Sequence, residues 1–342
     1  AREYLWAAQN GDAYICKSSG ILVSSQERQN AYRKLTDAEK LVRECEDFKE
    51  SVVSFDYNCD GFKEYVCRME KFNACITSRG GAIFELDVMK KSGNYADNMS
   101  RVIQLDKCND NYEKGLFVDH LFEPEEYNNY INGRACKNGV FSDKFYREVS
   151  FNPQKHEFLL ETDSHFPSLN QTINIRKKYI ISSSGIMVQY ILKNTSPIAL
   201  KAKFVVESNF AHTNFNIDDL YYYNLEVANE NEKLTIDTNE SAADKFLNGE
   251  LNNIEVVRLT DQKNGISFCF EPNEDCSYCY NPIYFNRPIF SSTEPDSVSM
   301  TFVSSLFWDI EIEPGMEIEK TVNFAISNVK KEKKIFCSPL VF

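Results

Sequence analysis

The chain has 342 residues, of which 42% are hydrophobic, and its 51 acidic and 38 basic side chains give a formal net charge of −13. This length supports a sizeable core in one or two domains. The acidic balance repels phosphate backbones, so it argues against general nucleic-acid binding. No segment approaches the run of about 18 apolar residues that a membrane helix needs, so we expect no membrane partner.

The cysteines favour a reducing compartment. There are 11, an odd number, scattered between Cys16 and Cys337, and such a pattern is typical of reduced thiols used as small hydrophobic residues. Cys276 and Cys279 form a single C-x-x-C without a second pair, and the chain has only four histidines, so a zinc site there is disfavoured. We expect a cytoplasmic protein. The chain also begins at Ala1 without an initiator Met or a secretory signal, so we expect either that processing removed an upstream part or that the chain is a fragment of a longer protein.

Residues 1–50 are predicted to be helical. Ser24 and Glu27 have the spacing of a capping box, and apolar residues then recur every three or four positions, which predicts a helix over Gln26–Glu46. Arg2–Ala13 is a shorter helical candidate. Two helices cannot form a stable domain alone, so a partner surface is required.

From Ser51 onward, apolar residues recur at every second position, as is typical of β-strands. Glu64–Met69, Asn73–Thr77 and Ala82–Asp87 alternate, and Gly80-Gly81 predicts a hairpin turn. The stretch Gly93–Ser142 is polar and is expected to be irregular apart from a helix around Glu125–Ile131. Further strands are then predicted between turn residues, at Glu157–Asp163, Ile173–Ile181, Ile186–Asn194, Leu200–Glu207, Leu234–Asp237, Asn253–Leu259, Ile266–Phe270, Ser297–Leu306 and Ile318–Ile326. So many strands indicate a sandwich of two large sheets.

One acidic loop has a spacing that suits calcium. Asp56, Asn58 and Asp60 stand two residues apart, Gly61 allows a turn, and Glu64 follows, which supplies several hard oxygens around a tight loop. The twelfth position holds Cys67 instead of Glu, so this is not the helix-loop-helix calcium motif. The alternative is an Asx-rich turn that leads into a strand.

Glu207 is the most conspicuous charge in an apolar strand. It follows Phe204-Val205-Val206 and precedes Ser208-Asn209, and a charge buried there is costly unless it is paired. Glu207 and Asn209 are therefore candidates for sugar binding, with a salt bridge on the sheet face as the alternative. Tyr221–Tyr223 and Trp308 could stack on sugars, although core packing is the more common role of such residues.

Several short segments together resemble family 57 glycoside hydrolases, the 4-α-glucanotransferase and α-amylase group. The first segment, Ala8–Tyr14, resembles the family's A-Q-C-N-D-A-Y stretch, and residues 56–64 resemble its acidic D-x-D-x-D-G segment. The run Gly80–Asp87 resembles G-G-x-x-x-E-L-D. Asp119-His120 resembles the D-H of the next block, and Pro314-Gly315 the P-G of the last strand pair.

The resemblance implies a mainly β fold, a large antiparallel two-sheet sandwich of the galactose-mutarotase type preceded by a short helical segment. We therefore divide the chain into a helical segment, 1–50, and a sandwich domain, 51–342. The resemblance adds Asp119 and His120 to the candidate substrate-binding residues, Glu207 and Asn209. It also implies that the catalytic carboxylates lie in an N-terminal β/α barrel, to which nothing in this chain corresponds, so no catalytic residue is assigned.

The resemblance fails at one point that bears on activity. The family continues Y-W-H-G after the alanine, whereas this chain reads Tyr14-Ile15-Cys16-Lys17. An aromatic platform and a titratable donor are thus missing, which should weaken glucan binding at that spot. The expected function is the non-barrel part of an α-glucan-processing enzyme, with maltooligosaccharide and a barrel in the same or another chain as partners. The alternative is a stand-alone carbohydrate- or protein-binding sandwich, a catalytically degenerate relative. Calcium is the only cofactor expected.

Overall fold

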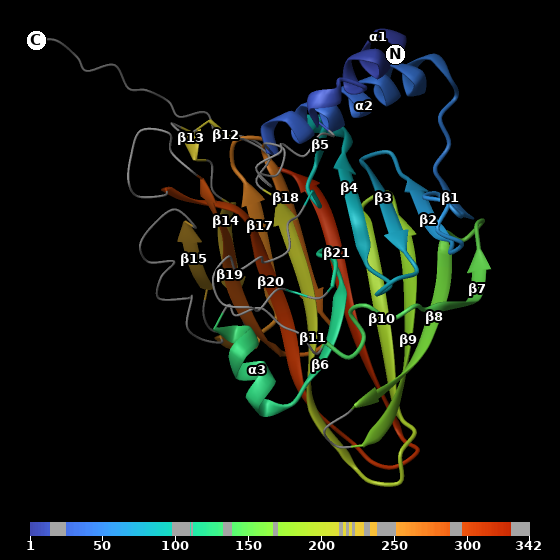
Figure 1. The fold of residues 1–342 in the computed structure, drawn as a ribbon, viewed down its shortest axis with the longest axis vertical. Helices are drawn as coiled ribbons and strands as arrows, with labels where there is room; N and C mark the ends of the chain where they lie inside the picture. Colours follow the sequence, from blue (N-terminus) through green and yellow to red (C-terminus); the bar gives the residue numbers. More distant parts are fainter. Residues whose placement is uncertain are drawn as a thin grey trace, which may run out of the picture.

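The computed structural model describes residues 1–13, 25–97, 110, 112–132, 139–166, 170–211, 215–216, 219–220, 223–228, 233–237, 251–287 and 296–329. These residues form a layered β-structure with a pair of helices at one end (Figure 1). Every described strand pair outside single bridges is antiparallel. No helix among them is long and apolar enough to cross a membrane.

The helical segment is held to the strands by polar contacts. It consists of α1 (Arg2–Ala8), the 3-10 turn η1 (Gly11–Ala13) and α2 (Ser25–Cys45). The predicted helix Gln26–Glu46 is therefore confirmed, whereas the first helical candidate is interrupted after Ala8. Arg28 of α2 forms an ion pair with Asp97 at 3.0 Å, and the Gln29 amide donates to the Asn94 carbonyl at 3.0 Å.

A small five-stranded sheet follows α2. Its strands, in order across the sheet, are β1 (Ser51–Phe55), β2 (Glu64–Arg68), β3 (Phe72–Thr77), β4 (Ile83–Val88) and β5 (Gly93–Asn94), and the 3-10 turn η2 (Met89–Lys91) joins the last two. The predicted alternation is confirmed, because Tyr65, Ile76 and Leu86 on one face are fully buried. This inner face joins the main core, and Tyr65 stacks on Phe158 with ring centroids 3.9 Å apart.

The glycine pair between β3 and β4 is required by backbone geometry. Gly80 and Gly81 both have a positive φ, of 67° and 57°. A Cβ at Gly80 would lie 2.5 Å from the Ser142 carbonyl oxygen, so no larger residue fits. The Gly81 carbonyl accepts a 2.6 Å hydrogen bond from the Tyr179 hydroxyl. The turn thus ties the small sheet to the sandwich.

Two larger sheets complete the sandwich. The nine-stranded sheet contains, in chain order, β7 (Arg147–Asn152), β8 (Glu157–Phe166), β9 (Gln171–Ser182), β10 (Gly185–Asn194), β14 (Tyr223–Ala228), β15 (Lys233–Asp237), β17 (Val256–Asp261), β18 (Ile266–Pro272) and β21 (Glu317–Asn328). The five-stranded sheet contains β6 (Val118–Phe122), β11 (Leu200–Ala211), β16 (Leu251–Ile254), β19 (Cys276–Arg287) and β20 (Asp296–Ile312). Helix α3 (Pro124–Ile131) and the short pair β12 (Phe215–Asn216) and β13 (Asp219–Leu220) are the remaining elements.

The predicted strands are found, with three differences. Asn253–Leu259 is two strands, β16 and β17, which belong to different sheets. Strand β6 lies inside the stretch that we expected to be irregular, although the helix expected there is confirmed as α3. Strands β1, β5, β7, β12, β13, β14 and β19 were not predicted. The two-sheet sandwich of mainly β class is confirmed, and the small sheet is an addition to it.

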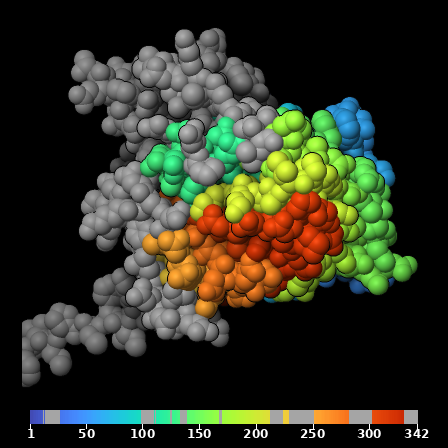
Figure 2. Space-filling view, turned by 90° about the horizontal axis from the view of Figure 1, so that it is seen from below, coloured from blue at the N-terminus to red at the C-terminus, as the bar shows by residue number. Residues whose placement is uncertain are grey.

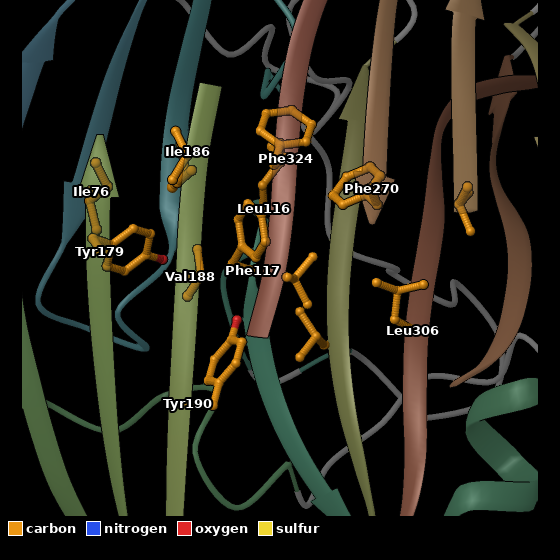
Figure 3. Close-up of a cluster of buried hydrophobic side chains, with 14 of the residues drawn as sticks. Ile76, Leu116, Phe117, Tyr179, Ile186, Val188, Tyr190, Phe270, Leu306 and Phe324 are labelled. Atoms are coloured by element: carbon orange, nitrogen blue, oxygen red, sulfur yellow. The ribbon is translucent and has the colours of Figure 1, made fainter. Parts of the chain in front are cut away.

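The core lies between the large sheets. Figure 3 shows Tyr179, Tyr190, Phe270 and Phe324 of the nine-stranded sheet together with Phe117 and with Leu306 of the five-stranded sheet. Phe324 is 1% exposed, and its ring centroid is 4.7 Å from that of Phe270 and 5.7 Å from that of Phe117. Aromatic rings therefore fill the centre of the core.

The end of the molecule opposite the helices is closed by two turns. In Figure 2 the red residues of the β20–β21 hairpin lie beside the yellow residues that join β10 and β11. The Asn194 carbonyl accepts from the Gly315 N–H at 2.9 Å, which links these turns. On the same view, blue residues of the β1–β2 hairpin lie beside green residues of the β7 edge.

Replacing Phe324 with Ala should lower the free energy of unfolding by about 3–5 kcal/mol, because a fully buried ring leaves a cavity in a close-packed core. Phe55→Ala is the matched control, since Phe55 is 46% exposed, and it should cost less than about 1 kcal/mol. Urea unfolding followed by tryptophan fluorescence measures both. Equal losses for the two variants would contradict the assignment of the core.

Candidate functional site

The four predicted substrate-binding residues are separated by strand alternation. His120 on β6 and Glu207 and Asn209 on β11 face outward from the five-stranded sheet, toward α3. Asp119 is the neighbour of His120, so it points to the opposite face, into the core between the sheets. All four side chains are 0% exposed. The structure therefore brings three of them together and places the fourth in a second cluster.

Glu207 is the centre of the outward cluster. Its Oε2 accepts hydrogen bonds from the hydroxyls of Tyr112 and Tyr130, each at 2.8 Å, and lies 3.1 Å from His120 Nε2. Its Oε1 accepts from Lys114 Nζ at 2.7 Å. Burial, followed by the Glu207 charge, raises the pKa of the Tyr130 hydroxyl well above its usual range. Tyr130 therefore remains a hydrogen-bond donor to the carboxylate.

Two further contacts connect this cluster to its surroundings. The Asn209 amide donates to Glu207 Oε1 at 2.8 Å and to the Gly115 carbonyl at 2.9 Å. Lys114 also forms an ion pair with Asp110 at 3.3 Å, and both of these side chains are buried. The carboxylate thus fastens the segment that precedes β6 onto β11, which offsets the cost of burying it.

Helix α3 covers the cluster. It lies beside the five-stranded sheet (Figure 1) and places Tyr127 and Tyr130 on that face. Beyond it, Gly139 lies so close to His120 that a Cβ there would be 2.2 Å from the Nδ1 of the ring. A sugar could reach Glu207 only if one of these covers moved. Sugar binding by His120, Glu207 and Asn209 stays a prediction.

Asp119 belongs to an ion pair that crosses the core. Its Oδ2 lies 2.8 Å from Lys177 Nζ of β9 and accepts from the Tyr146 hydroxyl at 3.1 Å. Burial raises the pKa of Asp119 and lowers the pKa of Lys177, and the contact between them opposes both changes. Lys177 also donates to the Phe117 carbonyl at 2.5 Å and lies over the ring of Tyr190, 5.3 Å from its centroid. This pair joins the two large sheets.

The acidic loop between β1 and β2 turns its carboxylates onto its own backbone. Asp56 accepts from the N–H groups of Asp60 and Gly61, at 3.1 and 3.0 Å, and Asp60 accepts from that of Phe62 at 2.8 Å. The buried Glu64 accepts from the Tyr57 N–H at 2.8 Å. Among the residues that the structure describes, no three His, Cys, Asp or Glu side chains converge as metal ligands. The loop has the contacts of an Asx-rich turn, and calcium binding stays a prediction.

A carboxyl pair that sequence reasoning did not single out as a site lies on the outer face of the small sheet. Glu85 and Asp87 are two residues apart on β4, so they share a face. Glu85 is half-buried, whereas Asp87 is 7% exposed and its Oδ1 has no hydrogen-bond partner. Burial, and then the neighbouring Glu85, raise the pKa of Asp87 well above its usual range. The signal in the sequence was the Glu-x-Asp alternation.

The remaining sequence candidates are structural or lie outside the described residues. Trp308 is 5% exposed and stacks on Phe204 in the core. Cys276 and Cys279, three positions apart on β19, lie on opposite faces of the strand. Tyr221, Tyr222 and the segment Tyr14–Lys17 are not among the described residues.

Comparison with known proteins gives a family. A family model described as alpha-amylase/4-alpha-glucanotransferase, C-terminal, matches residues 56–104 and 103–258. The 4-alpha-glucanotransferase from Thermococcus litoralis is similar in structure, with a TM-score of 0.69 and 19% identity, over 95% of this chain and 46% of that one. The chain thus spans about half the length of that enzyme. No curated protein matches the sequence.

A second structural similarity concerns the sandwich. A galactose mutarotase-like protein from Lactobacillus casei matches 81% of this chain and 100% of its own, with 11% identity and a TM-score of 0.53. At this identity the likeness shows the fold alone. It confirms the galactose-mutarotase type of sandwich that the family resemblance implies.

Replacing Glu207 with Ala should lower the free energy of unfolding by about 3–5 kcal/mol, because buried donors and the Lys114 ammonium lose their acceptor. Asp309→Ala removes a carboxylate that is 79% exposed and lies 2.7 Å from Lys203, so it should cost at most about 1 kcal/mol. Denaturant unfolding measures both. A Glu207→Ala variant as stable as the control would show that the cluster is not structural.

Asp87→Asn should make stability less dependent on pH. Because the folded-state pKa of Asp87 is raised, stability is lost as the pH rises through it, by about 1.4 kcal/mol for each pH unit of the increase. The wild type should therefore lose more stability than Asp87→Asn between pH 5 and pH 8, measured by thermal unfolding. Asp275→Asn, at an exposed position, is the control. Parallel wild-type and Asp87→Asn curves would contradict the raised pKa.

Calcium binding by the β1–β2 loop can be measured directly. Titration calorimetry of the wild type should detect calcium uptake that Asp60→Asn weakens, since the substitution removes one charged oxygen ligand. No heat of binding at millimolar calcium would end the prediction.

Proposed function

The chain belongs to the alpha-amylase/4-alpha-glucanotransferase C-terminal family, and we propose that it is the non-barrel part of an α-glucan-processing enzyme. It packs against a catalytic β/α barrel, in the same or another chain, and holds α-glucan or maltooligosaccharide. The reaction is that of a 4-α-glucanotransferase or an α-amylase, and its catalytic carboxylates belong to the barrel.

The family carries the first part of this proposal. Family 57 glycoside hydrolases are the group that the sequence segments resemble, and the Thermococcus litoralis match covers 46% of an enzyme whose name is 4-alpha-glucanotransferase. The rest of that enzyme has no counterpart in this chain. A cytoplasmic setting suits the seven described cysteines, all of which are free thiols.

The exposed helices are the observation that carries docking to a barrel. Ala8 is the only residue of α1 that is buried. Leu5 is 45% exposed and Trp6 is 59% exposed, and α2 adds Leu41 and Val42 at 36% each. Apolar side chains exposed on two adjoining helices mark an interaction surface. This surface stands at the end of the sandwich, away from the β20–β21 turn (Figure 1).

The alternative is a stand-alone carbohydrate- or protein-binding sandwich, and it predicts a different effect of substitutions on the helices. A chain that works alone has no barrel to cover α1, so substitutions of Trp6 should affect neither sugar binding nor stability. Barrel docking requires the same substitutions to affect the two-part enzyme.

Trp6→Glu separates these functions. In the isolated chain it should leave the thermal unfolding temperature unchanged, because the ring is mostly exposed. With the barrel present it should lower maltooligosaccharide conversion or weaken docking roughly tenfold or more, since a charge is forced into an apolar contact. Met316→Glu, at a residue 61% exposed in the β20–β21 turn, is the control. Full activity of the Trp6→Glu enzyme would contradict docking through α1.

A further inference from the structure

A cavity of about 470 Å³ opens between α1, the 3-10 turn η1 and α2. These elements lie together at one end of the molecule (Figure 1). The apolar part of the cavity lining consists of small side chains, namely Ala7, Ala8, Ala13 and Ala31. We call this space the helix cavity. Because the exposed Trp6 of α1 is not part of its lining, the cavity is separate from the surface proposed for barrel docking.

Two basic residues of α2, Arg33 and Lys34, belong to the lining of the helix cavity. They form no ion pair with any acid among the residues that the structure describes. The other basic residues of α2, which are Arg28, Lys40 and Arg43, each form an ion pair, at 3.0, 3.6 and 2.7 Å. The basic residues of α2 without an acidic partner are therefore those that border the cavity, where their charges attract an anion.

Printed contacts place the charged ends of both side chains. Arg33 Nη1 donates to Asn30 Oδ1 of the cavity lining at 3.2 Å. Lys34 Nζ lies 5.0 Å from the centroid of the Tyr4 ring, so this side chain reaches from α2 toward α1. A guanidinium and an ammonium group each carry several N–H donors, and these contacts leave most of them for a ligand. Two such cations side by side suit a phosphate group, which accepts several charge-assisted hydrogen bonds.

The acidic residue in the lining of the helix cavity lies away from the two cations. Glu27 stands seven residues before Lys34 on α2, which is about 10 Å along the helix axis. The two residues share a face of the helix, and Asn30 lies between them. Asn10, which follows α1, adds a second amide to the lining. The cavity thus has a basic end that suits an anion and polar groups beyond it that suit hydroxyls.

From this arrangement we propose that the helix cavity binds a monosaccharide phosphate. The phosphate group lies against Arg33 and Lys34, the sugar hydroxyls bond to Glu27 and Asn10, and the alanines contact the C–H groups of the sugar ring. A cavity of about 470 Å³ has the size of a small-molecule site and exceeds what inorganic phosphate alone would fill. The ligand is a small anion and not the α-glucan of the proposed function, so the proposal stands apart from that function.

Titration calorimetry of the chain with glucose 6-phosphate, inorganic phosphate and glucose tests this site. The wild type should bind glucose 6-phosphate roughly fivefold or more tightly than either of the other two probes, since each of these lacks one half of the ligand. Arg33→Gln and Lys34→Gln should each weaken binding of glucose 6-phosphate roughly fivefold or more through loss of charge-assisted hydrogen bonds. Both variants should keep the wild-type unfolding temperature, because glutamine is a good helix former. Ala31→Leu, which extends into the cavity, should also weaken binding of the sugar phosphate.

Two control variants should keep the wild-type affinity for glucose 6-phosphate. Lys71→Gln removes an exposed lysine between β2 and β3, and Trp6→Ala alters α1 outside the cavity lining. No heat of binding at millimolar glucose 6-phosphate, or an equal loss in Lys71→Gln and Lys34→Gln, would overturn the site. Inorganic phosphate bound as tightly as glucose 6-phosphate would overturn the sugar part of the ligand, and glucose bound as tightly would overturn the role of the cations. Barrel docking is tested separately by Trp6→Glu, so either proposal can fail alone.

Discussion

Strand β6 is buried on both of its faces, and the rest of the structure depends on how the charged side chains on these two faces find partners. Asp119 points inward and meets Lys177 of the opposite sheet, whereas His120 points outward and meets Glu207. All five residues of the strand are buried. The inward ion pair joins the two large sheets, and the outward cluster holds α3 and the segment before β6 against the sandwich. A buried charge that lost its partner would destabilise the contact that it makes.

This constraint separates the polar residues that support the fold from those that remain open to a ligand. The Glu207 cluster contains the residue types of a sugar site, but its acceptors are already filled by Tyr112, Tyr130 and Lys114. On the loop between β1 and β2, by contrast, Tyr57 is 55% exposed.

The sequence predicted the elements that have one buried face and one solvent-exposed face. Alternation located β8, β9 and β10, and the 3.6-residue period located α2 to within one residue at each end. It missed β6, because a strand buried on both faces shows no alternation, and Val-Asp-His-Leu-Phe reads as part of a polar loop. Asn253–Leu259 was predicted as one strand because the apolar pattern continues through Glu255, where the chain passes from one sheet to the other.

The candidate site was predicted in part for the same reason. Glu207 was recognised by its charge in an apolar strand, and its cluster with Asn209 and His120 is real, but Asp119 was grouped with His120 although adjacent strand residues face opposite ways. Glu85 and Asp87 were noticed only in a strand alternation and a family resemblance, because the burial of Asp87 is a property of three-dimensional packing.

The most direct test of the whole account is the composition of the protein purified from its native cell under non-denaturing conditions. Intact mass and N-terminal sequencing should find this chain joined to, or bound with, a barrel of about 250 residues or more, and the complex should convert maltooligosaccharides. A polypeptide that begins near Ala1, has no barrel partner and has no such activity would contradict the claim that this chain is one part of an α-glucan enzyme.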